Sequence, residues 1–286
     1  MTGPEQPIVM REPDWEARIR HILTTSGRAI ADILVPNGRM EEIEASLIKM
    51  SDQSFCARLT LGSKTAFLKS YDGDRPGTLL AFNRERDVLA AMKTSGLVPR
   101  LHIVSEAQRW LLMEEIPRRS SELSAYLAPD DFGYRVGTWI AEFEAIAPFQ
   151  AGAGNWLGYL QKLGLGPQVL RIENAADTLR QIPLCGSVIA RNDATLHNYL
   201  LTPENRLIGC DFESASLKPR GWEYLMTWHS LMERYGDYAG DAIDALSDGF
   251  DKSHRGGLIS DELNHVARIL FLARFLQLQD VDRRVA

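Results

Sequence analysis

Polar side chains that could bind a metal ion or a phosphate interrupt short apolar runs in the second half of the chain. Asp193 follows one apolar run, Asn198 opens the next, and Asp211 closes a third run at residues 206–211. Oxygen-bearing side chains at the ends of neighbouring short strands can converge on one point. Carboxylate and carboxamide oxygens suit Mg²⁺, which also takes oxygens from substrate phosphates. The spacing predicts a magnesium and phosphate site, although an isolated D-x4-N segment can equally be a pair of turn-forming residues.

Other acidic residues near the predicted site have two interpretations each. Glu213, two residues after Asp211, can be a second metal contact or can cap a helix. Further on, five aspartates recur at steps of four, three, four and three residues: Asp237, Asp241, Asp244, Asp248 and Asp251. If residues 235–252 form one helix, these carboxylates share a face, which is either a solvated stripe or a surface that attracts a cationic acceptor. The second interpretation assigns acceptor binding to Asp237, Asp241 and Asp244.

The elements around these residues are predicted from hydrophobic periodicity. In the first half, an amphipathic helix over 15–34 precedes an antiparallel meander, a helix over 78–94 and two more strands. In the second half, apolar positions recur at helical spacing, and only a few short strands interrupt them. The predicted strands are 43–49, 55–61, 65–69, 100–104, 110–114, 187–190, 198–201 and 206–210, and the later helices are 132–146, 221–235 and 263–278. This is an α+β chain with a sheet lobe over residues 1–117 and a mainly helical lobe over 118–286.

Composition excludes several classes of function. The 286 residues carry 32 Lys and Arg against 38 Asp and Glu, a net charge of −6, without a basic run of the kind that nucleic-acid binders use. No apolar stretch approaches the roughly 18 residues of a membrane span, and residues 1–16 lack the apolar core of a secretory signal. The three scattered cysteines indicate reduced thiols. We therefore expect a cytoplasmic protein that binds neither nucleic acid nor membrane, while its oligomeric state is left open.

The pattern D-x4-N-x12-D resembles the catalytic and metal-binding segments of the protein-kinase-like fold. The closer resemblance is to the aminoglycoside phosphotransferase and choline kinase-like families, whose signature H-G-D-x4-N is followed by I-D-x-[GDE]. Here the matching segments are residues 191–198 and 210–213. The resemblance covers roughly residues 43–232. It implies a bilobal fold with one helix on the N-terminal antiparallel sheet and a mainly helical C-terminal lobe.

The family resemblance also implies a role for each matching residue. Asp193 would accept or orient the proton of the attacking hydroxyl, and Asn198 and Asp211 would hold Mg²⁺ on the β- and γ-phosphates of ATP. Lys69 would contact the α- and β-phosphates, with Glu85 as its partner. The remaining nucleotide contacts would come from the strand leading to the adenine-binding hinge and from the loop between the first two strands: Glu114, Ile116, Ser51 and Ser54.

The predicted activity is therefore ATP- and Mg²⁺-dependent transfer of the γ-phosphoryl group to a hydroxyl of an unidentified small-molecule acceptor, with a cationic acceptor as one option. Three departures from the family pattern keep an alternative open. Arg191 stands where the family has histidine, Asn192 replaces its glycine, and the loop 50–55 contains no glycine. The alternative is a catalytically impaired, kinase-fold ATP-binding or scaffold protein. A metal-dependent hydrolase using Asp193, Asp211 and Glu213 is a further rival.

Overall fold

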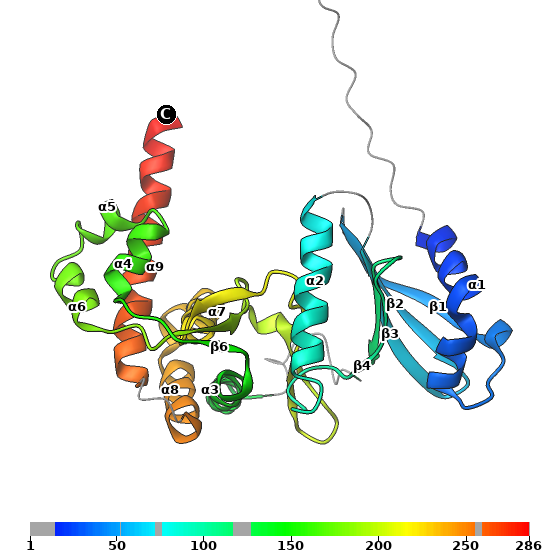
Figure 1. The fold of residues 1–286 in the computed structure, drawn as a ribbon. Helices are drawn as coiled ribbons and strands as arrows, with labels where there is room; N and C mark the ends of the chain where they lie inside the picture. Colours follow the sequence, from blue (N-terminus) through cyan, green and yellow to red (C-terminus); the bar gives the residue numbers. More distant parts are fainter. Residues whose placement is uncertain (1–14, 52, 72–75, 117–126, 255–258, 286) are drawn as a thin grey trace, which may run out of the picture. The chain divides into compact units, whose positions relative to one another are not determined.

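The chain forms two compact units in the computed structural model, which describes residues 15–51, 53–71, 76–116, 127–254 and 259–285 (Figure 1). The first unit comprises the described residues up to Arg86 together with Arg100–Glu115. The second comprises Asp87–Pro99 and the described residues from Ile116 onward. The predicted lobe boundary at 117/118 lies outside the described residues. Each unit is described by itself.

A five-stranded antiparallel sheet forms the centre of the first unit. The strands lie in the order β1-β2-β3-β5-β4, so the first three form a meander and β5 pairs with both β3 and β4. This confirms the predicted strands to within about two residues at each end. Their bounds are β1 (Glu44–Met50), β2 (Ser54–Leu61), β3 (Lys64–Tyr71), β4 (Leu101–Ser105) and β5 (Trp110–Glu114).

Helices pack on both faces of this sheet (Figure 1). On one face, α1 (Trp15–Leu34) buries Ile19, Ile22 and Ile30 against sheet residues that include Phe55 and Leu68. The helix therefore shares the core of the sheet, and a short 3₁₀ turn, η1 (Met40–Glu42), leads from it to β1. On the other face, α2 (Pro76–Ala91) begins within the first unit. Its Phe82 ring meets the ring of Tyr71 edge-on, with centroids 5.7 Å apart.

The second unit is mainly helical, as the sequence predicts. In the described part of this unit, two small sheets lie among the helices: a three-stranded sheet in the order β10-β7-β6 and the hairpin β8–β9. The strands are β6 (Phe149–Gln150), β7 (Ser187–Ala190), β8 (Tyr199–Leu201), β9 (Leu207–Gly209) and β10 (Ser216–Pro219). The helices are α3 (Pro129–Ile146), α4 (Trp156–Lys162), α5 (Gly166–Val169), α6 (Ala175–Gln181), α7 (Trp222–Tyr235), α8 (Gly240–Ser253) and α9 (Ser260–Val285), with 3₁₀ turns η3 (Leu196–Asn198) and η4 (Gly236–Tyr238).

Glycines let two of these helices approach each other at backbone distance. A Cβ atom at Gly133 of α3 would lie 2.1 Å from the carbonyl oxygen of Ala242 in α8, and one at Gly137 would lie 2.1 Å from that of Leu246. From the other side, a Cβ atom at Gly249 of α8 would lie 2.1 Å from a carbonyl oxygen of α3. Real side chains do not fit at such distances, so this helix pair requires glycine at all three positions.

Residues 235–252 do not form one helix, so the condition under which the five aspartates would share a face is not met. Helix α7 ends at Tyr235, the turn η4 follows, and α8 begins only at Gly240. The break occurs at Gly236, which adopts φ 56° and ψ −126°, a conformation that glycine tolerates and a helix interior does not. Asp237 therefore lies in a separate turn, whereas Asp241, Asp244 and Asp248 lie in α8.

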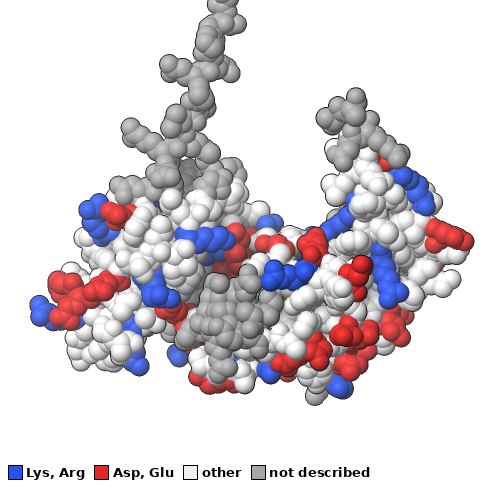
Figure 2. Space-filling view, turned by 180° about the vertical axis from the view of Figure 1, so that it is seen from behind, with Lys and Arg blue, Asp and Glu red and all other residues white. Residues whose placement is uncertain are grey.

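Acidic and basic side chains are interspersed on the face drawn in Figure 2. This mixture agrees with the small net charge of −6. Within the described residues, no helix combines the length and the apolar character that crossing a bilayer requires.

Candidate active site

A buried ion pair links the sheet of the first unit to α2. Lys69 is the sixth residue of β3, and its Nζ donates to Glu85 Oε2 at 2.7 Å. Only 5% of Lys69 and 3% of Glu85 are exposed. A buried charge without a partner costs several kcal/mol, so each of these residues needs the other. The structure thus brings together the two residues that the family pattern pairs as nucleotide contacts, and their role stays a prediction.

Tyr71 is a third member of this buried group that the sequence analysis missed. Its hydroxyl donates to Glu85 Oε2 through a short hydrogen bond, and its ring centroid lies 5.3 Å from Lys69 Nζ. Residues two apart on a strand point to the same face, so Tyr71 shares the face of Lys69. That periodicity was present in the sequence and could have predicted the contact.

Helix α1 holds the end of β3 through one guanidinium group. Arg18 donates to Ser70 Oγ at 2.8 Å, to the carbonyl oxygen of Tyr71 at 2.9 Å and to that of Gln108 at 2.8 Å. These bonds fix the strand directly after Lys69 and tie it to the turn between β4 and β5. The hydrophobic periodicity of residues 15–34 predicts the helix but gives it no role, and no sequence pattern marks Arg18 as its contact residue.

In the turn between β1 and β2, polar groups hydrogen-bond to one another. Ser51 N–H donates to the carbonyl oxygen of Ser54 at 2.8 Å, and Ser51 Oγ accepts from the N–H groups of Gln53 and Ser54 at 3.3 and 3.1 Å. The donors predicted to contact phosphates are therefore already bonded within the turn. A phosphate could take them only by replacing these bonds.

The predicted hinge residues lie at the end of β5 and directly after it. Glu114 is the last residue of this strand and pairs with Ala66 of β3, while its N–H donates to the carbonyl oxygen of Arg100 at 2.8 Å. Ile116 lies two residues further and is buried. Their contact with an adenine ring stays a prediction.

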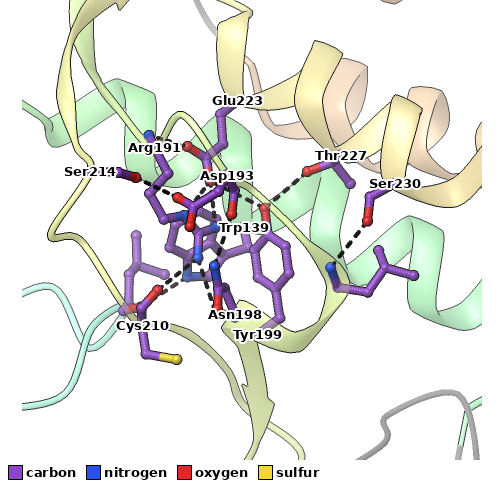
Figure 3. Close-up of polar contacts among 12 residues, drawn as sticks. Trp139, Arg191, Asp193, Asn198, Tyr199, Cys210, Ser214, Glu223, Thr227 and Ser230 are labelled. Carbon is purple, nitrogen blue, oxygen red and sulfur yellow. Dashed lines mark hydrogen bonds and ion pairs between the residues drawn. The ribbon is translucent and has the colours of Figure 1, made fainter. Parts of the chain in front are cut away.

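In the second unit, the loop after β7 folds around the carbonyl oxygen of Asp193 (Figure 3). This oxygen accepts from Thr195 N–H at 2.7 Å and from Asn198 Nδ2 at 2.8 Å. The loop thereby brings Asp193 and Asn198 together. The Asp193 carboxylate accepts a short hydrogen bond from the hydroxyl of Ser214, which the sequence analysis did not single out.

The β8–β9 hairpin places Asn198 beside the segment that carries Asp211. Tyr199 pairs with Gly209, and Cys210 N–H donates to the carbonyl oxygen of Asn198 at 2.9 Å. Asp211 has φ 64°, a left-handed conformation that few non-glycine residues adopt but that aspartate tolerates comparatively well. Such strain concentrates at functional sites.

The residues present fit Mg²⁺. The side-chain nitrogen of Asn198 donates to the carbonyl oxygen of Asp193. The side-chain oxygen of Asn198 is therefore the atom suited to bind a hard cation. Carboxylate oxygens of Asp211 and Glu213 lie within 4.8 Å of each other. Asn198, Asp211 and Glu213 would hold the ion. Glu213 lies close enough to Asp211 for the metal-contact interpretation, which stays a prediction.

The acidic residues proposed for acceptor binding do not form one continuous helix face. Asp237 lies in η4, and Asp241 and Asp244 lie on α8, all three exposed. Asp251, the last of the series, accepts from Ser260 N–H at 3.0 Å and from Ser260 Oγ at 2.6 Å at the start of α9. Asp251 is therefore a structural contact between helices.

No family model and no curated protein sequence matches this chain. Solved structures are similar to it at low sequence identity. A choline kinase from Streptococcus pneumoniae is 14% identical, over 90% of this chain and 92% of that one, with a TM-score of 0.53. A choline kinase from Cryptosporidium parvum is 12% identical, over 89% and 87%, with a TM-score of 0.56. An aminoglycoside phosphotransferase from Alicyclobacillus acidocaldarius is 14% identical, over 86% and 83%, with a TM-score of 0.54.

These similarities show the fold. The chain has the protein-kinase-like fold of these phosphotransferases, and the α+β fold predicted from the sequence is confirmed.

Proposed function

We propose that this protein is an ATP- and Mg²⁺-dependent small-molecule kinase that transfers the γ-phosphoryl group of ATP to a hydroxyl of its acceptor. One observation carries the proposal: the β8–β9 hairpin sets Asn198 beside the Asp211 segment, next to the loop that presents the Asp193 carboxylate. The fold shared with solved choline kinases and aminoglycoside phosphotransferases supports the reaction class.

Each residue would contribute to positioning and charge neutralisation, which are what phosphoryl transfer requires from a protein. Asp193 would accept a hydrogen bond from the acceptor hydroxyl, orient it and take its proton as the new P–O bond forms. Lys69, held by Glu85, would contact the α- and β-phosphates. Mg²⁺ held by Asn198 and Asp211 would neutralise charge on the β- and γ-phosphates.

The proposed acceptor class follows from exposed acidic residues. Asp237, Asp241 and Asp244 place three exposed carboxylates within eight residues of the chain. Closely spaced like charges attract oppositely charged ligands. We therefore propose a cationic acceptor, such as an amino alcohol or an amino sugar, which a library of charged and neutral alcohols would test.

Thermal unfolding with and without Mg·ATP tests nucleotide and metal binding. Saturating Mg·ATP stabilises the folded state by about 2.7 kcal/mol at one hundred times Kd, and the melting temperature rises by several degrees. Asp211→Asn tolerates the left-handed backbone yet removes a charged ligand, so most of the rise disappears. Asp177→Asn, an exposed aspartate on α6, serves as the matched control and keeps it. An undiminished rise in Asp211→Asn would remove Asp211 from the metal site.

Transfer is tested by ATP consumption across the library of alcohols. Asp193→Asn is expected to abolish acceptor-dependent turnover while it keeps the Mg·ATP shift. Wild-type activity in this variant would disprove the role of Asp193.

The second candidate is a catalytically impaired ATP-binding protein of the same fold, which the self-closed turn at Ser51–Ser54 favours. It predicts the Mg·ATP shift without consumption of ATP with any acceptor. Release of phosphate from esters without ATP would instead support the metal-dependent hydrolase.

A further inference from the structure

The guanidinium group of Arg191 lies at the centre of the segments that carry the proposed metal ligands (Figure 3). Its Nη1 donates to the carbonyl oxygens of both Asn198, at 2.9 Å, and Cys210, at 3.0 Å. One side chain therefore bridges the residue that supplies the carboxamide and the residue directly before Asp211. Arg191 itself lies two residues before Asp193, so three separate stretches meet at this group.

Glu223 of α7 fixes the other side of the guanidinium. Glu223 Oε1 accepts from Arg191 Nε at 2.7 Å and through a second, short bond from Nη2. Glu223 Oε2 accepts from the backbone N–H of Arg191 at 2.8 Å. Arg191 is 0% and Glu223 1% exposed, so the paired charges are isolated from water.

Three aromatic rings surround this cation and limit how it can move. The guanidinium carbon lies 4.5 Å from the ring centroid of Tyr199, 5.1 Å from that of Trp139 and 5.4 Å from that of Phe212. Arginine can form this arrangement because its planar group donates in several fixed directions and packs against aromatic faces. Lysine presents a point charge on a flexible stem and lacks this geometry.

A buried ion pair is by itself weak evidence for stability, because the cost of removing two charges from water offsets their attraction. The structural effect of the Arg191–Glu223 pair is to fix the backbone at Asn198 and Cys210. Asp211 adopts φ 64° immediately after the carbonyl group held by Arg191, and a strained conformation persists only where its surroundings determine it.

We infer that Arg191, anchored by Glu223, is the positioning residue that aligns Asn198 with Asp211 and holds Asp211 in its left-handed conformation. The part played in metal binding rests on the proposed function, whereas the alignment of the hairpin does not. Glu223 is the necessary partner of Arg191 in this role, because it binds both the side chain and the backbone N–H of Arg191.

The double variant Arg191→Met with Glu223→Gln tests the inference without leaving an unpaired buried charge. Glutamine keeps an oxygen for the Arg191 backbone N–H, and methionine keeps volume among the rings. The amide of Cys210 reports on the alignment, because it bonds to the carbonyl oxygen of Asn198. We expect its hydrogen exchange to accelerate at least tenfold, with exchange in α9 within twofold of wild type.

The Mg²⁺ concentration that gives half of the ATP-dependent rise in melting temperature should also increase at least tenfold in the double variant. Arg191→Lys retains the charge and should show both effects if the double variant does not fold. Arg206→Lys, an exposed arginine next to β9, is the matched control and should show neither.

Wild-type exchange at Cys210 in a folded variant would overturn the inference, as would an unchanged Mg²⁺ requirement. If the wild-type protein shows no response to Mg·ATP, the proposed function fails, and the exchange comparison alone still decides the alignment role.

Discussion

At the scale of single residues, the Tyr71 hydroxyl should contribute to the stability of the fold, because it donates to the same buried Glu85 carboxylate that pairs with Lys69. Both Lys69 and Tyr71 donate to Glu85 Oε2, and all three residues are buried. Tyr71→Phe keeps the ring but removes one donor from a buried anion. A hydrogen bond to a charged group contributes about 1.5–3 kcal/mol, so the free energy of unfolding should fall by that order. Urea unfolding measures it.

Tyr238→Phe is the control for this prediction, because Tyr238 is 87% exposed. Its unfolding free energy should stay within about 0.5 kcal/mol of wild type. Equal effects in the two variants would mean that the hydroxyl of Tyr71 does not support Glu85.

The residues of the candidate site differ in how visible they are in the sequence. Asp193, Asn198 and Asp211 were predicted because each is a polar residue at the edge of an apolar strand. Arg18 and Ser214 could not be predicted, because their contacts join segments 52 and 21 residues apart whose approach depends on tertiary packing. Arg191 was seen only as a departure from a pattern. Its partner Glu223 lies 32 residues away, on a helix whose contact with Arg191 depends on tertiary packing.

At the scale of elements, the contact between α3 and α8 depends on glycine rather than on the apolar periodicity that predicted α3. In Gly137→Ala, the new methyl group would lie 2.1 Å from the carbonyl oxygen of Leu246, and backbone cannot yield as a side chain can. Overpacking costs about 1–3 kcal/mol or more, which exceeds the gain of about 1 kcal/mol in helix propensity. Because the clash is with backbone, the cost lies at the upper end of this range, and we expect a net loss of about 2 kcal/mol in chemical denaturation.

Gly158→Ala in α4 is the matched control for this helix contact. The nearest atom to its new methyl group is Asn155 Oδ1 at 3.6 Å, an ordinary contact. This variant should therefore be as stable as wild type or more stable by up to about 1 kcal/mol. If Gly137→Ala were as stable as Gly158→Ala, α3 and α8 could move apart at little cost in free energy.

Helices and strands were predicted well where one face is apolar, because burial of that face decides the local structure. The single helix considered over residues 235–252 does not form, and that segment contains both Gly236 and Gly240. The evenly spaced aspartates suggested a continuous face, whereas the backbone of Gly236 leaves the helix. The close packing of α3 against α8 could not be predicted in this way. Hydrophobic periodicity gives the buried face of each helix but not the distance between two helices that are far apart in the sequence.

At the scale of the whole molecule, the stability of the fold should depend on pH through Glu144. This residue lies in α3 and is buried; its carboxylate accepts from Gly221 N–H at 2.8 Å and lies 3.8 Å from both Arg220 Nε and His254 Nε2. Burial raises the pKa of Glu144 to about 7, with Glu223 adding to the rise, while the Gly221 bond and Arg220 oppose it. The folded state thus binds a proton that the unfolded state releases near pH 4.5.

Between pH 4.5 and 7 the folded chain therefore carries one more proton at Glu144 than the unfolded chain, and this group makes stability fall as pH rises. The facing His254 acts in the opposite sense, because burial lowers its pKa and stability is lost as pH falls. The surface carboxylates contribute equally to the free energies of unfolding of wild type and Glu144→Gln, so the difference between the two proteins isolates Glu144 together with its contact to His254. We expect urea unfolding to show this difference moving in favour of Glu144→Gln by roughly 1–3 kcal/mol between pH 5 and 8. A pH-independent difference would mean that Glu144 stays ionised in the fold, held by Arg220 and the Gly221 amide.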